Sequence, residues 1–115
     1  MKYRDIVIST DFIEIEYYLE QIGFEDAKYS SAEDNFLTGQ EIKELGVDYS
    51  FLHCDDVYVL CEDMPTAGAL QDKRKYGFAP MSVLRVYSDD ENKTEKVLKI
   101  LSDILEKDQL IIASA

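Results

Sequence analysis

The residue types that form covalent intermediates are scarce in this chain, which has one histidine, His53, and two cysteines, Cys54 and Cys61. His53 and Cys54 are neighbours in a run that predicts a strand, where consecutive side chains point to opposite faces, so they form no catalytic pair without a bulge. The two cysteines would stand roughly 13 Å apart along a hairpin, too far for a disulfide. One histidine and two scattered cysteines also fall short of a zinc site. We therefore expect two buried structural thiols.

Carboxylates are the other chemically active groups, and they occur as adjacent acids: Glu25-Asp26, Asp55-Asp56, Glu62-Asp63 and Asp89-Asp90-Glu91. Acid–base catalysis by a carboxylate pair needs both groups to converge on one substrate, whereas adjacent acids in turns usually diverge. The sequence has no calcium-binding loop spacing, no phosphate-binding glycine loop and no nucleophile elbow. We expect no enzyme activity, no cofactor and no metal site, with weak Mg²⁺ or Ca²⁺ binding as the alternative.

Length and composition indicate one folded unit. The chain has 115 residues, of which 46% are apolar, and its eight tyrosines and five phenylalanines supply large side chains for a core. We expect a single α+β domain over residues 1–115. Neither a signal peptide nor an apolar run of membrane-spanning length is visible, and the cysteines are too few for a disulfide framework. The expected location is cytoplasmic, with reduced thiols and no membrane partner.

The first third of the chain predicts a strand, a helix and a short second strand. Residues 4–10 predict a strand because Ile6, Val7 and Ile8 are β-branched, and Asp11 or Thr10 can cap a helix that Gly23 closes. The apolar positions of this helix recur at helical spacing, and residues 24–31 follow as a short strand. Residues 32–46 are ambiguous, although residues 38–41 resemble a capping box before a short helix. The helix core positions are Phe12, Ile15, Leu19 and Ile22.

Residues 48–62 predict a β-hairpin whose two-residue turn is Asp55-Asp56. This turn pairs Cys54 with Val57 and assigns every side chain to a face. Leu52, Cys54, Val57, Val59 and Cys61 form one face, called here the aliphatic face. Tyr49, Phe51, His53, Tyr58 and Leu60 form the other, called here the aromatic face. Both faces are mainly apolar, so both need covering by helices, a loop or a partner.

The last third predicts a loop over residues 64–80 with a short helix near 67–75, a strand over 82–87, a helix and a buried strand over 110–113. A capping box at Ser88–Glu91 would open that last helix. Two β-α-β halves therefore flank the hairpin. We predict a mostly antiparallel sheet with helices on one face, ferredoxin-like or a similar sandwich. The alternative is a mixed sheet with a helix on each side.

Negative charge is concentrated in the first half of the chain. The formal net charge is −12, from 24 acids and 12 bases. Residues 1–64 hold 16 acids and four bases, whereas residues 65–115 hold eight of each, so the first half carries the whole excess. This distribution argues against nucleic acid as a direct partner and is typical of a surface that attracts a basic protein. A solvated acidic surface with no partner is the simpler explanation.

The first helix places tyrosines among carboxylates, a pattern suited to docking a surface rich in lysine and arginine. We predict that the chain is an acidic, protein-binding inhibitor of a basic partner, most of all an immunity-type protein that blocks the active site of a nuclease toxin. That analogy rests on size and charge, and no sequence motif supports it. The predicted partner-binding residues are Glu14, Glu16, Tyr17, Tyr18, Glu20, Asp55, Asp56 and Tyr58.

A second function remains open on the same residues. The aromatic face of the hairpin could pack against a second copy across a two-fold axis, with a metabolite bound between subunits and residues 64–80 closing over it. The chain would then be a small homo-oligomeric regulatory domain, most simply a homodimer. The two hypotheses differ in oligomeric state, which light scattering measures.

Overall fold

A computed structural model describes residues 2–9, 11–36, 49–63, 82–104 and 110–114. Within these ranges it contains the strands and the two longer helices in the order that the sequence predicts, together with a short helix in a stretch that the sequence left ambiguous. The strands are β1 (Lys2–Ile8), β2 (Glu25–Asp26), β3 (Tyr49–Cys54), β4 (Val57–Asp63), β5 (Ser82–Ser88) and β6 (Leu110–Ser114). The helices are α1 (Phe12–Gln21), α2 (Ser31–Phe36) and α5 (Glu91–Ile104).

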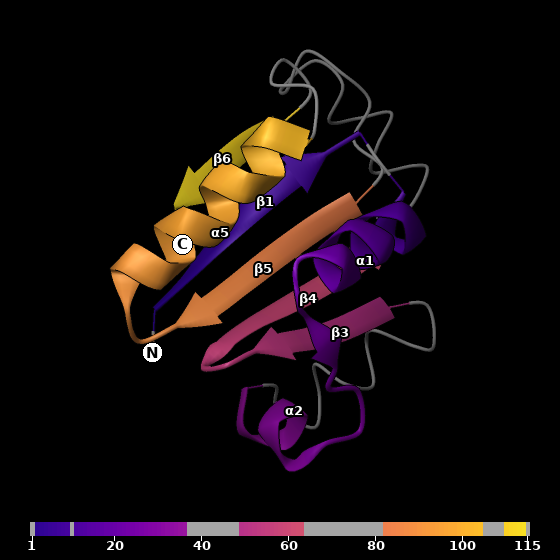
Figure 1. Cartoon of the computed structure of the whole chain (residues 1–115), viewed down its shortest axis with the longest axis vertical. Coiled ribbons are helices and arrows are strands. Elements are labelled where there is room, and N and C mark those ends of the chain that lie inside the picture. The colour runs from indigo at the N-terminus through magenta and orange to yellow at the C-terminus, as the bar shows by residue number, and fades with distance from the viewer. Residues whose placement is uncertain (1, 10, 37–48, 64–81, 105–109, 115) are drawn as a thin grey trace.

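The strands form one six-stranded sheet in the order β2-β3-β4-β5-β1-β6, and every pairing is antiparallel. The prediction of an α+β protein with an antiparallel sheet is confirmed, and the alternative of a mixed sheet is wrong for the strands described. β1 lies between β5 and β6, so the first and last parts of the chain are interleaved (Figure 1). The ferredoxin-like variant of this class stays a prediction.

The register of the hairpin is the predicted one. Cys54 pairs with Val57, and Asp55 adopts a positive φ of 52°, as a tight two-residue turn requires. An Asp tolerates this left-handed conformation better than most residues, which explains why Asp-Asp serves here without a glycine. The alternation along β3 and β4 follows from this register, so the aliphatic and aromatic faces are confirmed.

Helices α1 and α5 cover the aliphatic face (Figure 1). They bury the apolar stripes that the sequence predicts, with Ile15 and Leu19 from α1 and Val97, Leu98 and Leu101 from α5. Each fully buried aliphatic side chain stabilises the fold by about 1.5–3 kcal/mol. The strand residues of this core are Ile6, Ile8, Leu52, Val57, Val59, Cys61, Leu84 and Val86.

The aromatic face is covered as well, and part of its cover is α2. The ring of Phe36, at the end of α2, lies 4.4 Å from that of Tyr58 and 5.5 Å from that of Tyr87. Phe51 and Leu60, which belong to the same cluster, are buried. The expectation that the helices share one face therefore holds for α1 and α5, whereas the end of α2 packs on the opposite face.

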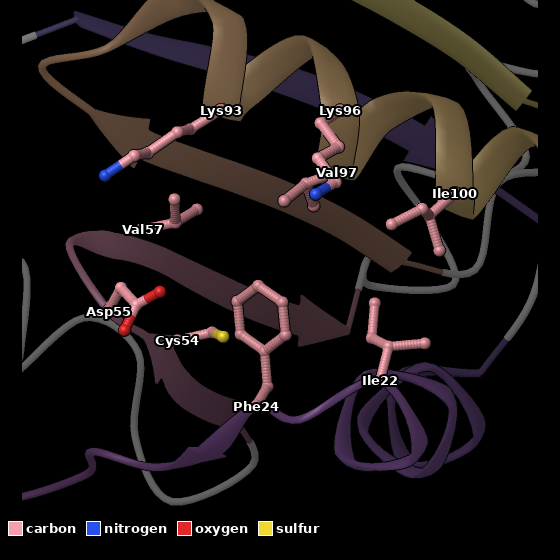
Figure 2. A pocket seen from close by; sticks show the side chains of 9 residues that line it. All are labelled: Ile22, Phe24, Cys54, Asp55, Val57, Lys93, Lys96, Val97 and Ile100. Carbon is pink, nitrogen blue, oxygen red and sulfur yellow. The ribbon is translucent and has the colours of Figure 1, made fainter.

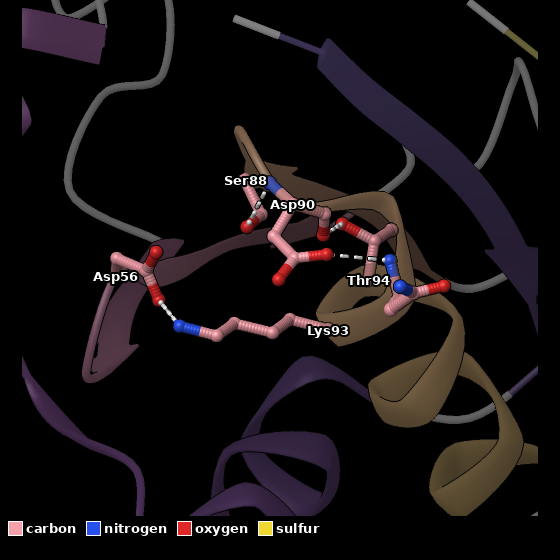
Figure 3. A network of polar contacts seen from close by, with 6 residues as sticks. Asp56, Ser88, Asp90, Lys93 and Thr94 are labelled. Carbon is pink, nitrogen blue, oxygen red and sulfur yellow. Dashed lines mark hydrogen bonds and ion pairs between the residues drawn. The ribbon is translucent and has the colours of Figure 1, made fainter.

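The ends of the helices match the predictions in one case and correct them in another. Asp11 caps α1 by accepting a hydrogen bond from the Ile13 amide at 2.7 Å, and Gly23 has the positive φ expected of it, 101°. The predicted capping box at Ser88 is wrong. Asp90 caps α5 instead, accepting from the Asn92 amide at 2.9 Å, because Ser88 is the last residue of β5 and its hydroxyl accepts from the Asp90 amide (Figure 3).

The predicted second strand is shorter than expected. β2 comprises only Glu25–Asp26, because Phe24 turns into the core and Tyr29 adopts a positive φ of 65° just before α2. The helices and the capping box predicted within residues 37–48 and 64–81 lie outside the described residues.

Candidate functional site

The outer side of α1 carries two of the large apolar side chains that the described residues expose. Ile13 is 63% and Tyr17 is 58% exposed, and they stand four residues apart on one side of the helix. Glu20 continues this line one turn later, and Glu14 stands beside it; both are exposed. We call Ile13, Glu14, Tyr17 and Glu20 the α1 surface. Its combination of an aromatic ring, an aliphatic side chain and carboxylates fits a protein-binding role.

Two other predicted residues of α1 hold the helix in place. The Tyr18 hydroxyl donates to Glu14 Oε1 at 2.7 Å, and this hydrogen bond to a carboxylate raises the pKa of Tyr18. The Tyr18 ring packs against the core. Glu16 accepts a hydrogen bond from the Ser50 hydroxyl at 2.8 Å, which ties α1 to β3. Tyr18 and Glu16 therefore border the α1 surface and have structural partners of their own.

The hairpin tip brings the next two predicted acids to a different place. Asp55 and Asp56 are exposed at the turn, and Asp56 forms an ion pair with Lys93 of α5 at 2.7 Å (Figure 3). The hydrogen bond from Lys93 lowers the pKa of Asp56, and the same bond raises the pKa of Lys93. The charge of Asp56 is thus compensated by Lys93, whereas Asp55 lies at the mouth of a cavity described below.

Tyr58 does not join the other predicted residues. It lies on the aromatic face, against Phe36 and Phe51, while α1 covers the opposite face of the sheet. The eight residues predicted from sequence are thus divided among a helix surface, a hairpin tip and the far side of the sheet. Alternation along a strand decides this division, because Tyr58 follows Val57 and must point away from it.

The cysteines and the histidine are also separated by the sheet. Cys61 is fully buried and Cys54 is half-buried; both lie on the aliphatic face, and neither forms a disulfide. His53 points to the aromatic side, where it stacks on Tyr58 and its Nε2 stands 4.0 Å from a Glu25 carboxylate oxygen. Among the described residues, no three His, Cys, Asp or Glu side chains gather where they could hold a metal.

A cavity between α5, the hairpin tip and the chain after α1 was not predicted from sequence. Its volume is about 230 Å³, and its walls come from three segments that are far apart in the chain (Figure 2). No local pattern signals such a cavity, since only the packing of α5 beside the hairpin creates it. It is lined by Ile22, Phe24, Cys54, Asp55, Val57, Lys93, Lys96, Val97 and Ile100.

A buried polar cluster was also missed. Glu33, only 2% exposed, accepts hydrogen bonds from the Tyr49 hydroxyl at 3.0 Å and from the Tyr29 amide at 3.2 Å. Burial and this bond to Glu33 together raise the pKa of Tyr49 far above its ordinary value. The ammonium of Lys28 lies 4.1 Å from the centre of the Tyr49 ring. These contacts hold α2 against β3, so we assign the cluster a structural role.

The fold and these surfaces define an antiparallel α+β protein with a candidate docking helix and a small cavity. No described helix has the length and apolar character needed to cross a membrane. No protein-family model matches the chain, and no curated protein and no solved structure shows significant similarity to it. Function must therefore be argued from the surfaces themselves.

Proposed function

We propose that this protein is an acidic inhibitor that binds a basic protein partner through the α1 surface, in the manner of an immunity protein that blocks the active site of a nuclease toxin. The observation that carries the proposal is the exposure of Ile13 and Tyr17 between the carboxylates of Glu14 and Glu20. Exposed apolar side chains on a helix have a free-energy cost in water that burial against a partner removes.

The proposed mechanism has two steps. The excess negative charge of residues 1–64 attracts a basic surface and raises the association rate. Tyr17 and Ile13 then enter the partner's cleft, where burial of an aromatic anchor slows dissociation. The bound partner would be unable to reach its own anionic substrate. The proposed location is the cytoplasm, where an inhibitor of a nuclease protects the cell's nucleic acid.

The alternative function, a homo-oligomer with a metabolite between its subunits, relied on an uncovered aromatic face. Within one chain, Phe51 is fully buried and Tyr49 and Leu60 are nearly so. That face therefore has little apolar area left to bury against a second copy, which favours the inhibitor over the oligomer. The loop invoked to close over the metabolite, residues 64–80, lies outside the described residues.

The test combines capture with kinetics. The protein is immobilised, exposed to a lysate of its source organism at low salt and washed at about 0.5 M salt, which screens charge attraction between surfaces not in close contact. A retained basic protein is then purified, and its binding rates are measured with wild type and variants. Glu20→Lys should lower the association rate several-fold. Tyr17→Ala should raise the dissociation rate at least tenfold, as expected for an aromatic anchor.

The matched control is Asp103→Lys, which makes the same charge change at an exposed position of α5. It should alter both rates far less than Glu20→Lys. If the retained protein is a nuclease, equimolar addition of wild type should abolish its activity and Tyr17→Ala should not. Equal effects of Glu20→Lys and Asp103→Lys, with Tyr17→Ala unchanged, would remove the α1 surface from the proposal.

A further inference from the structure

The cavity beside α5 is apolar in its depth. Phe24, Val57 and Val97 contribute buried side chains to it, and Ile22 and Ile100 complete the apolar walls (Figure 2). A volume of about 230 Å³ lies just below the range of sites that take drug-sized molecules, so a small apolar body fits it. Water held against such walls is displaced favourably by hydrocarbon.

The charged groups at the cavity are not equivalent. Lys93 is paired with Asp56, so its charge is already compensated. Lys96, one turn further along α5, is exposed and lines the cavity, and within the described ranges it has no ion-pair or hydrogen-bond partner. Figure 2 shows its side chain descending beside Val97 toward Phe24. The ammonium group of Lys96 therefore lies at an apolar cavity without an opposite charge from the described residues paired to it.

We propose that this cavity binds a small carboxylate with an apolar body, such as a medium-chain fatty acid, whose carboxylate pairs with Lys96. The hydrocarbon would lie against Phe24, Val57 and Val97. A single negative charge is preferred to a phosphate dianion, because the carboxylate of Asp55 stands at the same mouth and repels further negative charge. This inference is independent of the α1 surface and of any protein partner.

The cavity contains its own reporter, the half-buried thiol of Cys54. The experiment measures the rate at which N-ethylmaleimide modifies Cys54 while octanoate is titrated. The fully buried Cys61 serves as the internal reference that stays unreacted in the folded protein. Octanoate should slow Cys54 modification to a saturable limit. It should also shift the methyl NMR signals of Val57 and Val97 along the same titration curve.

The role of Lys96 is tested with Lys96→Met, which keeps the apolar stem of the side chain and removes the charge. The apparent affinity for octanoate should fall roughly tenfold, the worth of one charge-assisted hydrogen bond. The control is Lys99→Met, an exposed lysine of α5 that does not line the cavity, and it should leave the affinity unchanged. Octan-1-ol, with the same chain and no charge, should bind wild type about as weakly as octanoate binds Lys96→Met.

Three results would overturn the proposal. The first is the absence of any protection of Cys54 or shift of the valine methyls at millimolar octanoate. The second is equal binding of octanoate and octan-1-ol with Lys96→Met unaffected, since the cavity would then select no carboxylate. The third is protection of Cys54 that grows with protein concentration alone, together with a dimer by light scattering, because a second copy would then occupy the cavity.

Discussion

Glu33 shows at the scale of one residue how the chain keeps an acid in its interior. A buried carboxyl group is tolerated only when hydrogen-bond donors replace the water that it loses. The Tyr49 hydroxyl and the Tyr29 amide supply two such donors. The Ser30 hydroxyl in turn accepts from the Glu33 amide at 3.4 Å, so side chain and backbone of Glu33 are both engaged.

Replacing Tyr49 with Phe should therefore destabilise the protein although the ring is retained. Glu33 would lose its donor from β3 while staying buried, at a cost of about 1–3 kcal/mol in the free energy of unfolding. Urea denaturation measures this difference. The control is Tyr29→Phe, because Tyr29 is strongly exposed and contributes its amide rather than its hydroxyl; it should change stability by less than about 0.5 kcal/mol. Equal losses in the two variants would contradict the assigned role of the Tyr49 hydroxyl.

At the level of secondary structure, the C-terminal end of α1 determines how Phe24 comes to line the cavity. The amides of Ile22 and Gly23 donate to carbonyls of the last helical turn, and the amide of Phe24 donates to the Leu19 carbonyl at 3.0 Å. The chain reverses within these three residues, which directs Phe24 into the core. This reversal needs the φ of 101° that Gly23 adopts, a conformation that strains any residue with a Cβ.

Gly23→Ala should lower the free energy of unfolding by about 1–2 kcal/mol. The cost is conformational, because the added Cβ would meet only Cys54 Sγ at 4.0 Å, an ordinary van der Waals contact. Gly23→Asn should cost less, since Asn tolerates positive φ better than Ala. Thermal and urea unfolding of both variants give the comparison, and an Ala variant as stable as wild type would show that the reversal carries no strain.

For the whole molecule, the pair of Asp56 and Lys93 joins parts of the chain that local structure leaves separate. It links the tip of the β3–β4 hairpin to the first turns of α5, at the edge of the cavity. Arg4 and Glu95 make a similar link between β1 and α5 at 2.9 Å. Both pairs are partly exposed, so each contributes little on its own and is weakened by salt.

The pH dependence of stability reports on the Asp56 pair. The pKa of Asp56 is held below its ordinary value of 3.8, so its contribution is complete above that pH and is lost as the pH falls through the folded-state pKa. Wild type should therefore exceed Asp56→Asn in stability by a constant small amount near neutral pH, and the difference should vanish in acid. Urea unfolding at a series of pH values tests this. Asp55→Asn, the turn neighbour without the ion pair, is the control. A difference that persists unchanged down to the most acidic pH at which the protein remains folded would contradict the assignment.

Features that depend on residues close together in the chain could be predicted from the sequence. Alternation and a two-residue turn were enough to place Cys54 opposite Val57, and helical spacing was enough to identify the buried sides of α1 and α5. The cap at Asp11 and the closing residue Gly23 were equally local. The predicted N-cap of α5 was wrong because Ser88, Asp89 and Asp90 are all suitable cap residues. β5 extends through Ser88, so the helix begins later and Asp90 becomes the cap.

Which of these features come into contact depends on the packing of the whole chain. Alternation along the hairpin placed Tyr58 on the aromatic face, yet only the packing of α1 on the aliphatic face put Tyr58 and Tyr17 on opposite sides of the sheet. The cavity and the Glu33–Tyr49 pair join segments that are separated in the chain by many residues. Such contacts depend on which elements become neighbours when the apolar faces are buried. That outcome is a property of the whole packed chain, because hydrophobic burial has no directional preference that a short stretch of sequence could encode.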